Sequence, residues 1–354
     1  MLKNYYSDGL YPSITASEFD EEDKKKAISV FSGCHRALFY YLLVSSIAVL
    51  VLTVLLTISQ FFVPLPTIEA IINHPVFSPA VQIVCMYFIA FPVYCYMLKD
   101  IDCADRDKST VSFMEFLSLA AISIALMQIG AVIAELAKYY ISSSFSLPYE
   151  IEMTNKLLKA FDVVPAMLLV IVIGPIFEEL VFRKILIDRL SVYGDRLAII
   201  VSSVAFGLHH GNLSQFIYTT IAGIVFGHIY TKTRRIIYPI GLHMLTNLFG
   251  TLPTTLYYVE YDAVAESTPD LNAVFNGEIT LTYILFVMKI VLILLGILMF
   301  LFSFFIKKYR WSRLCDIEIP KSKLLRIVVF NRGTMMFFIL CLFTIVISFF
   351  EMGQ

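Results

Sequence analysis

The sequence predicts an all-α protein, a polytopic transmembrane helical bundle with about eight or nine spans. Of its 354 residues, 58% are hydrophobic and 16% are charged, whereas a soluble domain has roughly 45–50% apolar and about 25% charged residues. The apolar excess lies in long uncharged runs, which are typical of membrane helices when they exceed about 18 residues. The third observation is that lysine and arginine concentrate in alternate connecting segments, as bilayer topology requires.

Nine apolar runs account for the predicted helices, and ALFYYLLVSSIAVLVLTVLLTISQFF is the strongest of them. The fifth and sixth are short and are joined by HGNLSQ, so we expect half-depth helices that meet at a turn buried in protein or facing a water-filled cavity. Asn331 and Arg332 interrupt the start of the last run. The predicted spans are 37–62, 76–98, 113–141, 162–190, 196–210, 214–230, 236–258, 279–306 and 333–350.

The distribution of positive charge predicts a cytoplasmic N-terminus. The outer loops 63–75 and 259–278 carry no lysine or arginine, whereas 307–332 is strongly basic. A net charge of −1 gives no reason to expect a nucleic-acid partner. We divide the chain into a cytoplasmic segment (1–36), N-terminal membrane helices (37–159), a catalytic core (160–255) and C-terminal membrane helices with the basic loop (256–354).

Cysteine usage and the N-terminal composition set two further expectations. The six cysteines lie in apolar spans or in predicted cytoplasmic loops, and no CxxC pair occurs. We therefore expect neither a disulfide framework nor a thiolate metal site. The polar N-terminus predicts that no signal peptide is cleaved and that the first span acts as an uncleaved anchor.

The fourth span carries charges at membrane depth, in the stretch GPIFEELVFRKIL. Ionisable residues there are costly to bury and indicate function. Glu179 and Arg183 are four residues apart, so they share a helix face and can pair. Glu178 is rotated by about 100° from Glu179 and faces another surface.

Three later residues reach a similar depth on other helices. His210 ends the fifth span and shares a face with Phe206, while His243 and Asn247 are four residues apart on the seventh. With a rise of 1.5 Å per residue, Glu178 and these three residues lie about 12–21 Å from the inner ends of their helices. A carboxylate, two imidazoles and an amide can therefore meet inside the membrane.

Two chemistries remain open for this set, and both are amide hydrolysis. Glu178 and His210 can activate a water while His243 and Asn247 stabilise an oxyanion. Alternatively, Glu178, His210 and His243 bind Zn²⁺, with Glu179 as the base. We favour the first, without a cofactor, because an amide is a poor zinc ligand.

The same residues are also consistent with non-catalytic roles. The Glu179–Arg183 pair is consistent with a purely structural ion pair, and His209 and His228 with ordinary buried histidines bonded to a carbonyl. As a whole, the chain could also be a non-catalytic immunity or scaffold protein that binds a peptide, or a transporter that uses the buried charges to couple ions.

The three motifs EELVFR, FGLHH and HMLTN, in this order, resemble the CPBP family of CAAX-protease and bacteriocin-processing membrane proteins, also called Abi. The resemblance covers about residues 160–255. It implies an intramembrane protease that acts on a membrane-embedded or lipid-associated peptide or protein, in contact with membrane lipids. It implies Glu178 as general base with His210, and an oxyanion site at His243 and Asn247, with Glu179, Arg183 and Phe206 in support. It further implies a multi-pass protein of a bacterial cell membrane, and members of the family are linked to peptide maturation and to bacteriocin immunity.

Overall fold

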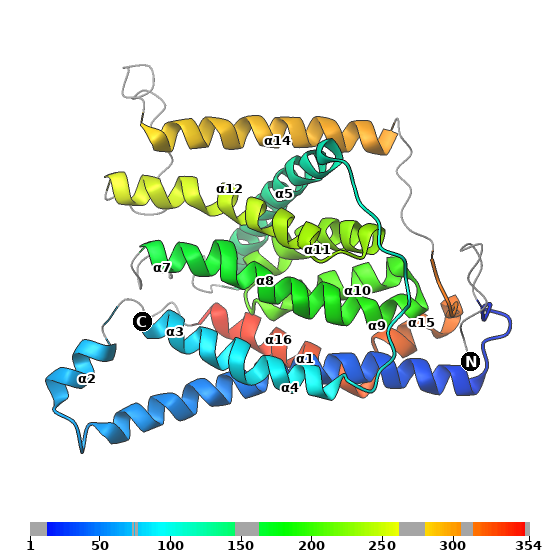
Figure 1. Cartoon of the computed structure of the whole chain (residues 1–354), viewed down its shortest axis with the longest axis horizontal. Coiled ribbons are helices and arrows are strands. Elements are labelled where there is room, and N and C mark those ends of the chain that lie inside the picture. Colours follow the sequence, from blue (N-terminus) through cyan, green and yellow to red (C-terminus); the bar gives the residue numbers. More distant parts are fainter. Residues whose placement is uncertain are drawn as a thin grey trace.

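The chain is predominantly helical in the part that the computed structural model describes, which comprises residues 13–72, 74, 77–145, 163–261, 280–305 and 314–350. Within these residues, the one extended pairing is an isolated parallel bridge between Ile14 and Ile317. Figure 1 shows α1 (Glu21–Ser59) along one side of the molecule and α14 (Leu281–Phe305) along the opposite side. The shorter helices that carry the candidate site lie between them.

The N-terminal helices begin with a capping box at Asp20. Its carboxylate accepts hydrogen bonds from the backbone N–H groups of Asp23 and Glu22, which satisfies donors at the helix start. These bonds, that from Asp23 first, lower the pKa of the Asp20 carboxyl below its usual value. The following elements are α2 (Leu65–Ile72), α3 (Phe77–Ile83), the π-helix η1 (Val84–Ala90), α4 (Phe91–Met97) and α5 (Phe113–Phe145).

The central part of the chain is broken into short pieces of different helix type, and two long helices follow. Its π-helices widen the turn locally and re-aim the side chains that follow, which is common at functional sites. The elements are α7 (Val163–Leu168), η2 (Leu169–Ile173), α8 (Gly174–Glu179), η3 (Leu180–Ile187), α9 (Asp188–Leu190), η4 (Ser191–Tyr193), α10 (Asp195–His209), α11 (Leu213–Thr233) and α12 (Ile237–Tyr261). After α14 come α15 (Lys321–Val328) and α16 (Arg332–Ser348).

All nine predicted runs coincide with helical segments, but the predicted count of eight or nine spans is not confirmed. Within the described residues, four helices are long and apolar enough to cross a membrane, and a fifth span results if α15 and α16, bent by 59°, are counted together. The central elements fall short for physical reasons. Residues 163–193 are divided into short pieces, and α10 has 15 residues where a span needs about 20. The longer α11 and α12 contain many polar residues, which lower their hydropathy.

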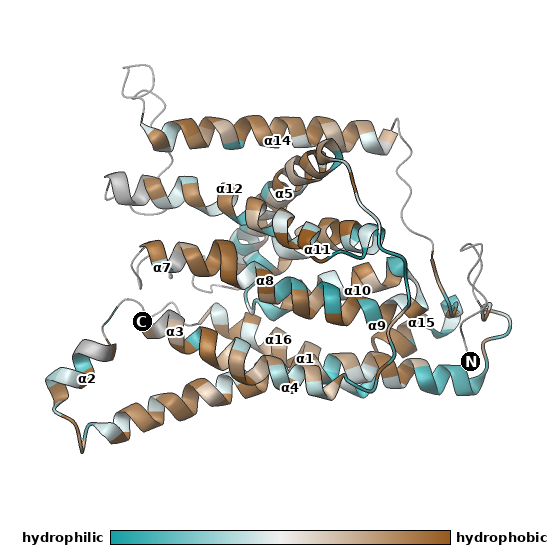
Figure 2. Ribbon diagram, viewed as in Figure 1, coloured by the Kyte–Doolittle hydropathy of each residue, from teal (hydrophilic) through white to brown (hydrophobic). Residues whose placement is uncertain are grey.

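The outer helices carry the surface expected of a membrane protein. Figure 2 shows brown, hydrophobic residues along most of α14 and along the second half of α1. Large apolar side chains on these helices are exposed, for example Leu50 at 62% and Leu298 at 63%. In water such a surface would be unfavourable, whereas against lipid it costs nothing. The chain is therefore an integral membrane protein.

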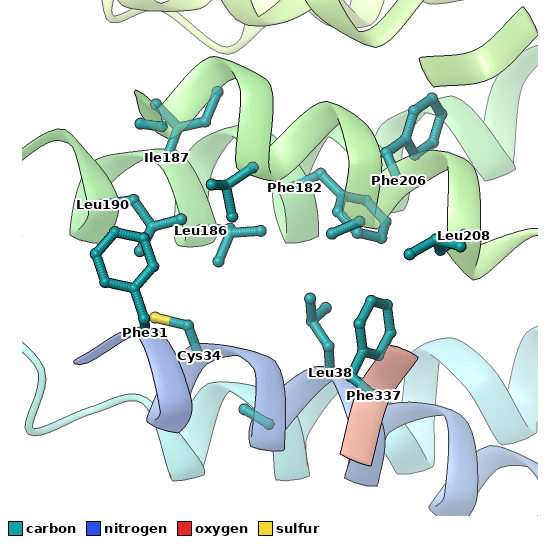
Figure 3. Close-up of a cluster of buried hydrophobic side chains, with 14 of the residues drawn as sticks. Phe31, Cys34, Leu38, Phe182, Leu186, Ile187, Leu190, Phe206, Leu208 and Phe337 are labelled. Atoms are coloured by element: carbon teal, nitrogen blue, oxygen red, sulfur yellow. The ribbon is translucent and has the colours of Figure 1, made fainter. Parts of the chain in front are cut away.

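The hydrophobic core joins the outer layer to the site-bearing helices. In Figure 3, Leu38 of α1 and Phe337 of α16 point toward Phe182 of η3, while Phe31 of α1 points toward Leu190 of α9. All five of these side chains are buried. The helix η3, which carries Arg183, consequently packs against aromatic and aliphatic side chains of α1 and α16.

The turn between α10 and α11 brings these two helices unusually close. Asn212 caps α11 by accepting from the N–H of Gln215, and Gly211 adopts φ +67° in the turn. A Cβ on Gly207 would lie only 2.6 Å from the backbone oxygen of Phe216. The absence of a side chain at Gly207 therefore permits the approach that places His210 beside the neighbouring helices.

Some predicted features lie outside the described residues. They include the junction at 159/160 between two proposed domains, most of the outer loop 259–278, and the first part of the basic loop, 307–313. The proposed boundary between residues 36 and 37 falls inside α1, because the polar residues from Glu21 onward continue the same helix.

Candidate active site

The centre of the site is a fully buried ion pair within one helical segment. The Nε of Arg183 lies 3.0 Å from Oε2 of Glu179, and both side chains have no exposed surface. The other oxygen of Glu179, Oε1, accepts a hydrogen bond from Nδ1 of His243 at 2.9 Å. The carboxylate of Glu179, the last residue of α8, thus links Arg183 of η3 to His243 of α12, which lies 64 residues after Glu179.

Aromatic rings complete the surroundings of Arg183. Its guanidinium carbon lies 4.5 Å from the centre of the Phe206 ring and 5.7 Å from that of Phe226, both within cation–π range. Among the residues that the structure describes, the guanidinium nitrogens find no aligned hydrogen-bond acceptor. Gly223 of α11 leaves the space they occupy, since a Cβ there would lie 3.3 Å from Nη2.

Glu178 and Glu179 face opposite nitrogens of one imidazole. Oε2 of Glu178 lies 3.6 Å from Nε2 of His243, while Glu179 holds Nδ1. The Glu178 side chain is 19% exposed, whereas that of Glu179 is fully buried. The predicted rotation between the two carboxylates is thus present, and it gives them different environments.

His210 is oriented by its own helix. Its Nδ1 bonds the carbonyl oxygen of Phe206 at 2.8 Å, which leaves Nε2 for another partner. The Phe206 ring contacts the rings of both His210, at 4.9 Å, and His243, at 5.6 Å. Glu178 and His210 form no direct hydrogen bond, unlike Glu179 and His243.

The side chain of Asn247 donates a hydrogen bond to a backbone carbonyl that has no helical donor. In the π-helix η2, the N–H of Gly174 bonds the carbonyl of Leu169, and Pro175 has no N–H. The carbonyl of Val170 is therefore left without a helical donor. Nδ2 of Asn247 donates to it at 2.8 Å, and the second N–H of the same amide remains for another acceptor.

The structure brings the predicted residues together unequally. Glu178, Glu179, Arg183 and His243 form one contiguous set, while Phe206 lies between His210 and His243 and touches both rings. Asn247 is anchored to the backbone beside this set rather than to its side chains. Phe226, which stacks on His243 at 4.9 Å with an interplanar angle of 26°, was not anticipated from the sequence. The Gly223-xxx-Gly227 spacing, typical of close helix packing in membranes, was the available signal for this helix.

The neighbouring His209 differs from expectation. It makes no carbonyl bond, because its buried Nδ1 has no hydrogen-bond partner among the described residues. Its ring instead stacks on Tyr41 of α1, with centroids 5.7 Å apart and an interplanar angle of 20°. His209 therefore packs the site against α1 through its ring face.

The alternative ligand set for Zn²⁺ is Glu178, His210 and His243. Within the described residues, no three His, Cys, Asp or Glu side chains are gathered in an arrangement that could hold a metal ion. His243 already has a carboxylate at each ring nitrogen. The set as it stands does not fit the ion.

Comparison with known proteins identifies relatives of the central segment. Residues 160–249 match the family model described as type II CAAX prenyl endopeptidase Rce1-like. The chain is 34% identical over 144 residues to a Bacillus subtilis (strain 168) protein named "Putative membrane peptidase YdiL", across 40% of this chain and 57% of that protein. It is 30% identical over 112 residues to "Membrane-embedded CAAX protease MroQ" of Staphylococcus aureus (strain USA300), across 30% of this chain and 44% of that protein.

These matches confirm the resemblance drawn from the three motifs. The matched stretches span about half the length of the two relatives, and all three motifs fall within residues 160–249. No solved structure matches the chain.

Proposed function

From the match of residues 160–249 to the type II CAAX prenyl endopeptidase family, we propose that this chain is an intramembrane endopeptidase. It hydrolyses a peptide bond of a membrane-associated peptide or protein, with a water activated by glutamate and histidine. The observation that carries the proposal is His243, held at Nδ1 by Glu179 and faced at Nε2 by Glu178. A structural ion pair alone would have no need of the second carboxylate.

In this mechanism, Glu178 takes the proton of the attacking water. It is suited to do so because it is partly exposed and carries no hydrogen bond from Arg183, whereas Glu179 is occupied by Arg183 and His243. A base placed beside its water gains typically 10²–10⁴ in rate. His210, with Nδ1 fixed on the Phe206 carbonyl, has Nε2 left to assist Glu178.

The charge balance supports an oxyanion role for His243. Two carboxylates face one guanidinium, so a protonated His243 makes the buried set neutral overall. A neutral set is far cheaper to keep at membrane depth than a net charge. Nε2–H of His243 and the second N–H of Asn247 then serve as donors to the oxyanion that develops during attack.

The site's surroundings suggest where the substrate comes from. The lipid-facing surface of the outer helices and the membrane depth of the set favour a peptide that is itself embedded in, or attached to, the bilayer. We propose a bacterial cell membrane, with the N-terminus in the cytoplasm, as the setting, and no metal as cofactor. Phe206, Glu179 and Arg183 act by holding His210 and His243 in place.

Substitution of Glu178 tests the proposal. Purified wild type in liposomes is incubated with a pool of quenched-fluorescence peptides of randomised sequence that end in cysteine plus three residues, each made with and without a farnesyl group. We expect cleavage by wild type and by Glu318→Gln, an exposed control, and loss of at least a hundredfold in Glu178→Gln. Unchanged cleavage in Glu178→Gln would refute the role of the base, and no cleavage by wild type would refute the assignment.

A further inference from the structure

A buried tyrosine from outside the matched segment lies beside the candidate base. Tyr87 belongs to η1, more than 70 residues before residue 160, and is 6% exposed. Its ring stacks face to face on Phe177, with centroids 4.1 Å apart and an interplanar angle of 7°. Phe177 directly precedes Glu178, so the stack fixes the position of the phenol relative to the carboxylate.

Gly174 shows that the two oxygens border one small space. A Cβ built on Gly174 would lie 3.7 Å from Oε1 of Glu178 and 3.9 Å from the hydroxyl oxygen of Tyr87. Only a glycine keeps this space free of side-chain atoms.

The buried phenols fall into two groups, those whose hydroxyl forms a hydrogen bond and those, such as Tyr41, Tyr87 and Tyr193, with no such bond among the described residues. Tyr94 donates to the carbonyl of Val181 at 3.3 Å, and Tyr230 donates to Asp188 at 2.8 Å. Buried tyrosines normally find such a partner. What distinguishes Tyr87 within this second group is its position, since its hydroxyl and Oε1 of Glu178 border the same space at Gly174.

We propose that Tyr87 is a positioning residue for the reaction, and that its hydroxyl donates a hydrogen bond to the water that Glu178 deprotonates. The water gives one proton to Glu178, uses one lone pair to accept from Tyr87, and attacks the peptide carbonyl with the other. Tyr87 keeps its own proton throughout. This inference rests on the proposed function, and it makes the α3–η1–α4 segment part of the catalytic unit.

Removing the hydroxyl alone is the decisive change. Tyr87→Phe keeps the stack on Phe177, and Tyr94→Phe is the matched control, since it removes another buried hydroxyl whose bond goes elsewhere. With the cleaved peptide from the pool as substrate, we expect kcat of Tyr87→Phe to fall about tenfold, the value of one neutral hydrogen bond. KM and Tm should stay unchanged, and Tyr94→Phe should keep its kcat.

A second pair of variants separates donation from packing. With 4-aminophenylalanine at position 87 the ring still carries an N–H donor, whereas 4-cyanophenylalanine carries a group of similar size that cannot donate. We expect the first to retain most of kcat and the second to lose about tenfold. Equal kcat for the two, or a kcat loss in Tyr87→Phe that Tyr94→Phe reproduces, would overturn the inference.

The same assay distinguishes a failure of this inference from a failure of the proposed function. If wild type cleaves and Glu178→Gln does not, the protease assignment stands, and normal kcat in Tyr87→Phe would then refute only the role of Tyr87. If wild type cleaves no peptide of the pool, both fall together.

Discussion

The side-chain amide of Asn247 donates to the carbonyl of Val170 across 2.8 Å and replaces a backbone donor that the Gly174–Pro175 step cannot give. The donor that is missing in the π-helix η2 is therefore replaced by a side chain 77 residues further along the chain. The same bond fixes the amide beside His243, which lies one turn earlier on α12. In the proposed mechanism, stability and activity would therefore both depend on this bond.

Substitution of Asn247 tests that coupling. Asn247→Ala leaves the Val170 carbonyl without its donor, and such a loss costs about 1–3 kcal/mol of the free energy of unfolding. We expect a lower Tm in detergent together with a loss of cleavage. Asn247→Asp should behave alike, because an ionised carboxylate cannot donate.

Pro175 provides the complementary change. Pro175→Ala returns an N–H to the turn after η2, where it can serve the Val170 carbonyl in place of Asn247. We therefore expect Pro175→Ala/Asn247→Ala to be more stable than the sum of the two single losses predicts. Strict additivity in this double-mutant cycle would contradict the account.

Arg183→Ala should damage folding as well as activity. It leaves Glu179 fully buried without its ion-pair partner, and breaking a buried pair in this way costs about 3–5 kcal/mol. We expect poor expression and a lower Tm. Lys184→Ala is the control, since Lys184 is half exposed and its pair with Asp188 contributes at most about 1 kcal/mol.

Removing both charges of the Glu179–Arg183 pair distinguishes its effect on stability from its effect on cleavage. Glu179→Gln with Arg183→Met replaces the pair by groups of similar size, which is often neutral for stability. Expression and Tm should recover relative to Arg183→Ala, but cleavage should stay low because His243 loses its carboxylate. Full recovery of cleavage would show that the pair is only structural.

Gly207→Ala should separate α10 from α11. The new methyl group would meet the backbone oxygen of Phe216 at 2.6 Å, and a backbone atom cannot rotate away. Overpacking of this kind costs about 1–3 kcal/mol, visible as a lower Tm. Thr220→Ala should not rescue it, although the Thr220 hydroxyl is also close, because the Phe216 contact remains. Gly241→Ala, which meets only the end of the Phe116 ring at 3.2 Å, should be tolerated better.

Metal removal distinguishes the two hydrolytic mechanisms. We expect purified protein to hold no stoichiometric zinc and to keep its cleavage rate after dialysis against a chelator, because Glu178 and His243 serve as base and oxyanion donor. Loss of cleavage on chelation with recovery on addition of Zn²⁺ would instead make Glu178, His210 and His243 ligands. Elemental analysis before and after dialysis is the accompanying measurement.

Much of the helical layout follows from the sequence. Long apolar runs locate the outer helices, and the four-residue spacing of Glu179 and Arg183 correctly predicts their pairing. The number of spans does not follow, because apolarity alone cannot tell a membrane-crossing helix from a short helix packed inside protein. The charged run EFDEEDKKK is typical of a solvated helix face beside the bilayer, and its residues from Glu21 onward form the start of α1.

The site was predictable in its members more than in its contacts. The similar depth of Glu178, His210 and His243 could be worked out from the helix rise. The rotation of each helix about its own axis, relative to the neighbouring helices, could not. As a result, the sequence pairs Glu178 with His210, whereas the direct contact that the structure gives Glu178 is with Nε2 of His243, at 3.6 Å. Tyr87 and Val170 were unpredictable, since both act through π-helical backbone that apolar sequence does not reveal.

The position of Arg183 four residues after Glu179 also matters for how the protein is made. A single charge at the centre of a membrane helix costs about 2.5–3.5 kcal/mol during insertion by the translocon. Because both partners lie on one helix, they can neutralise each other as soon as that helix forms, before α12 has been synthesised. His243 follows 60 residues after Arg183 and docks onto a carboxylate that is already in place. The nascent chain can thus enter the bilayer before its charged centre is complete.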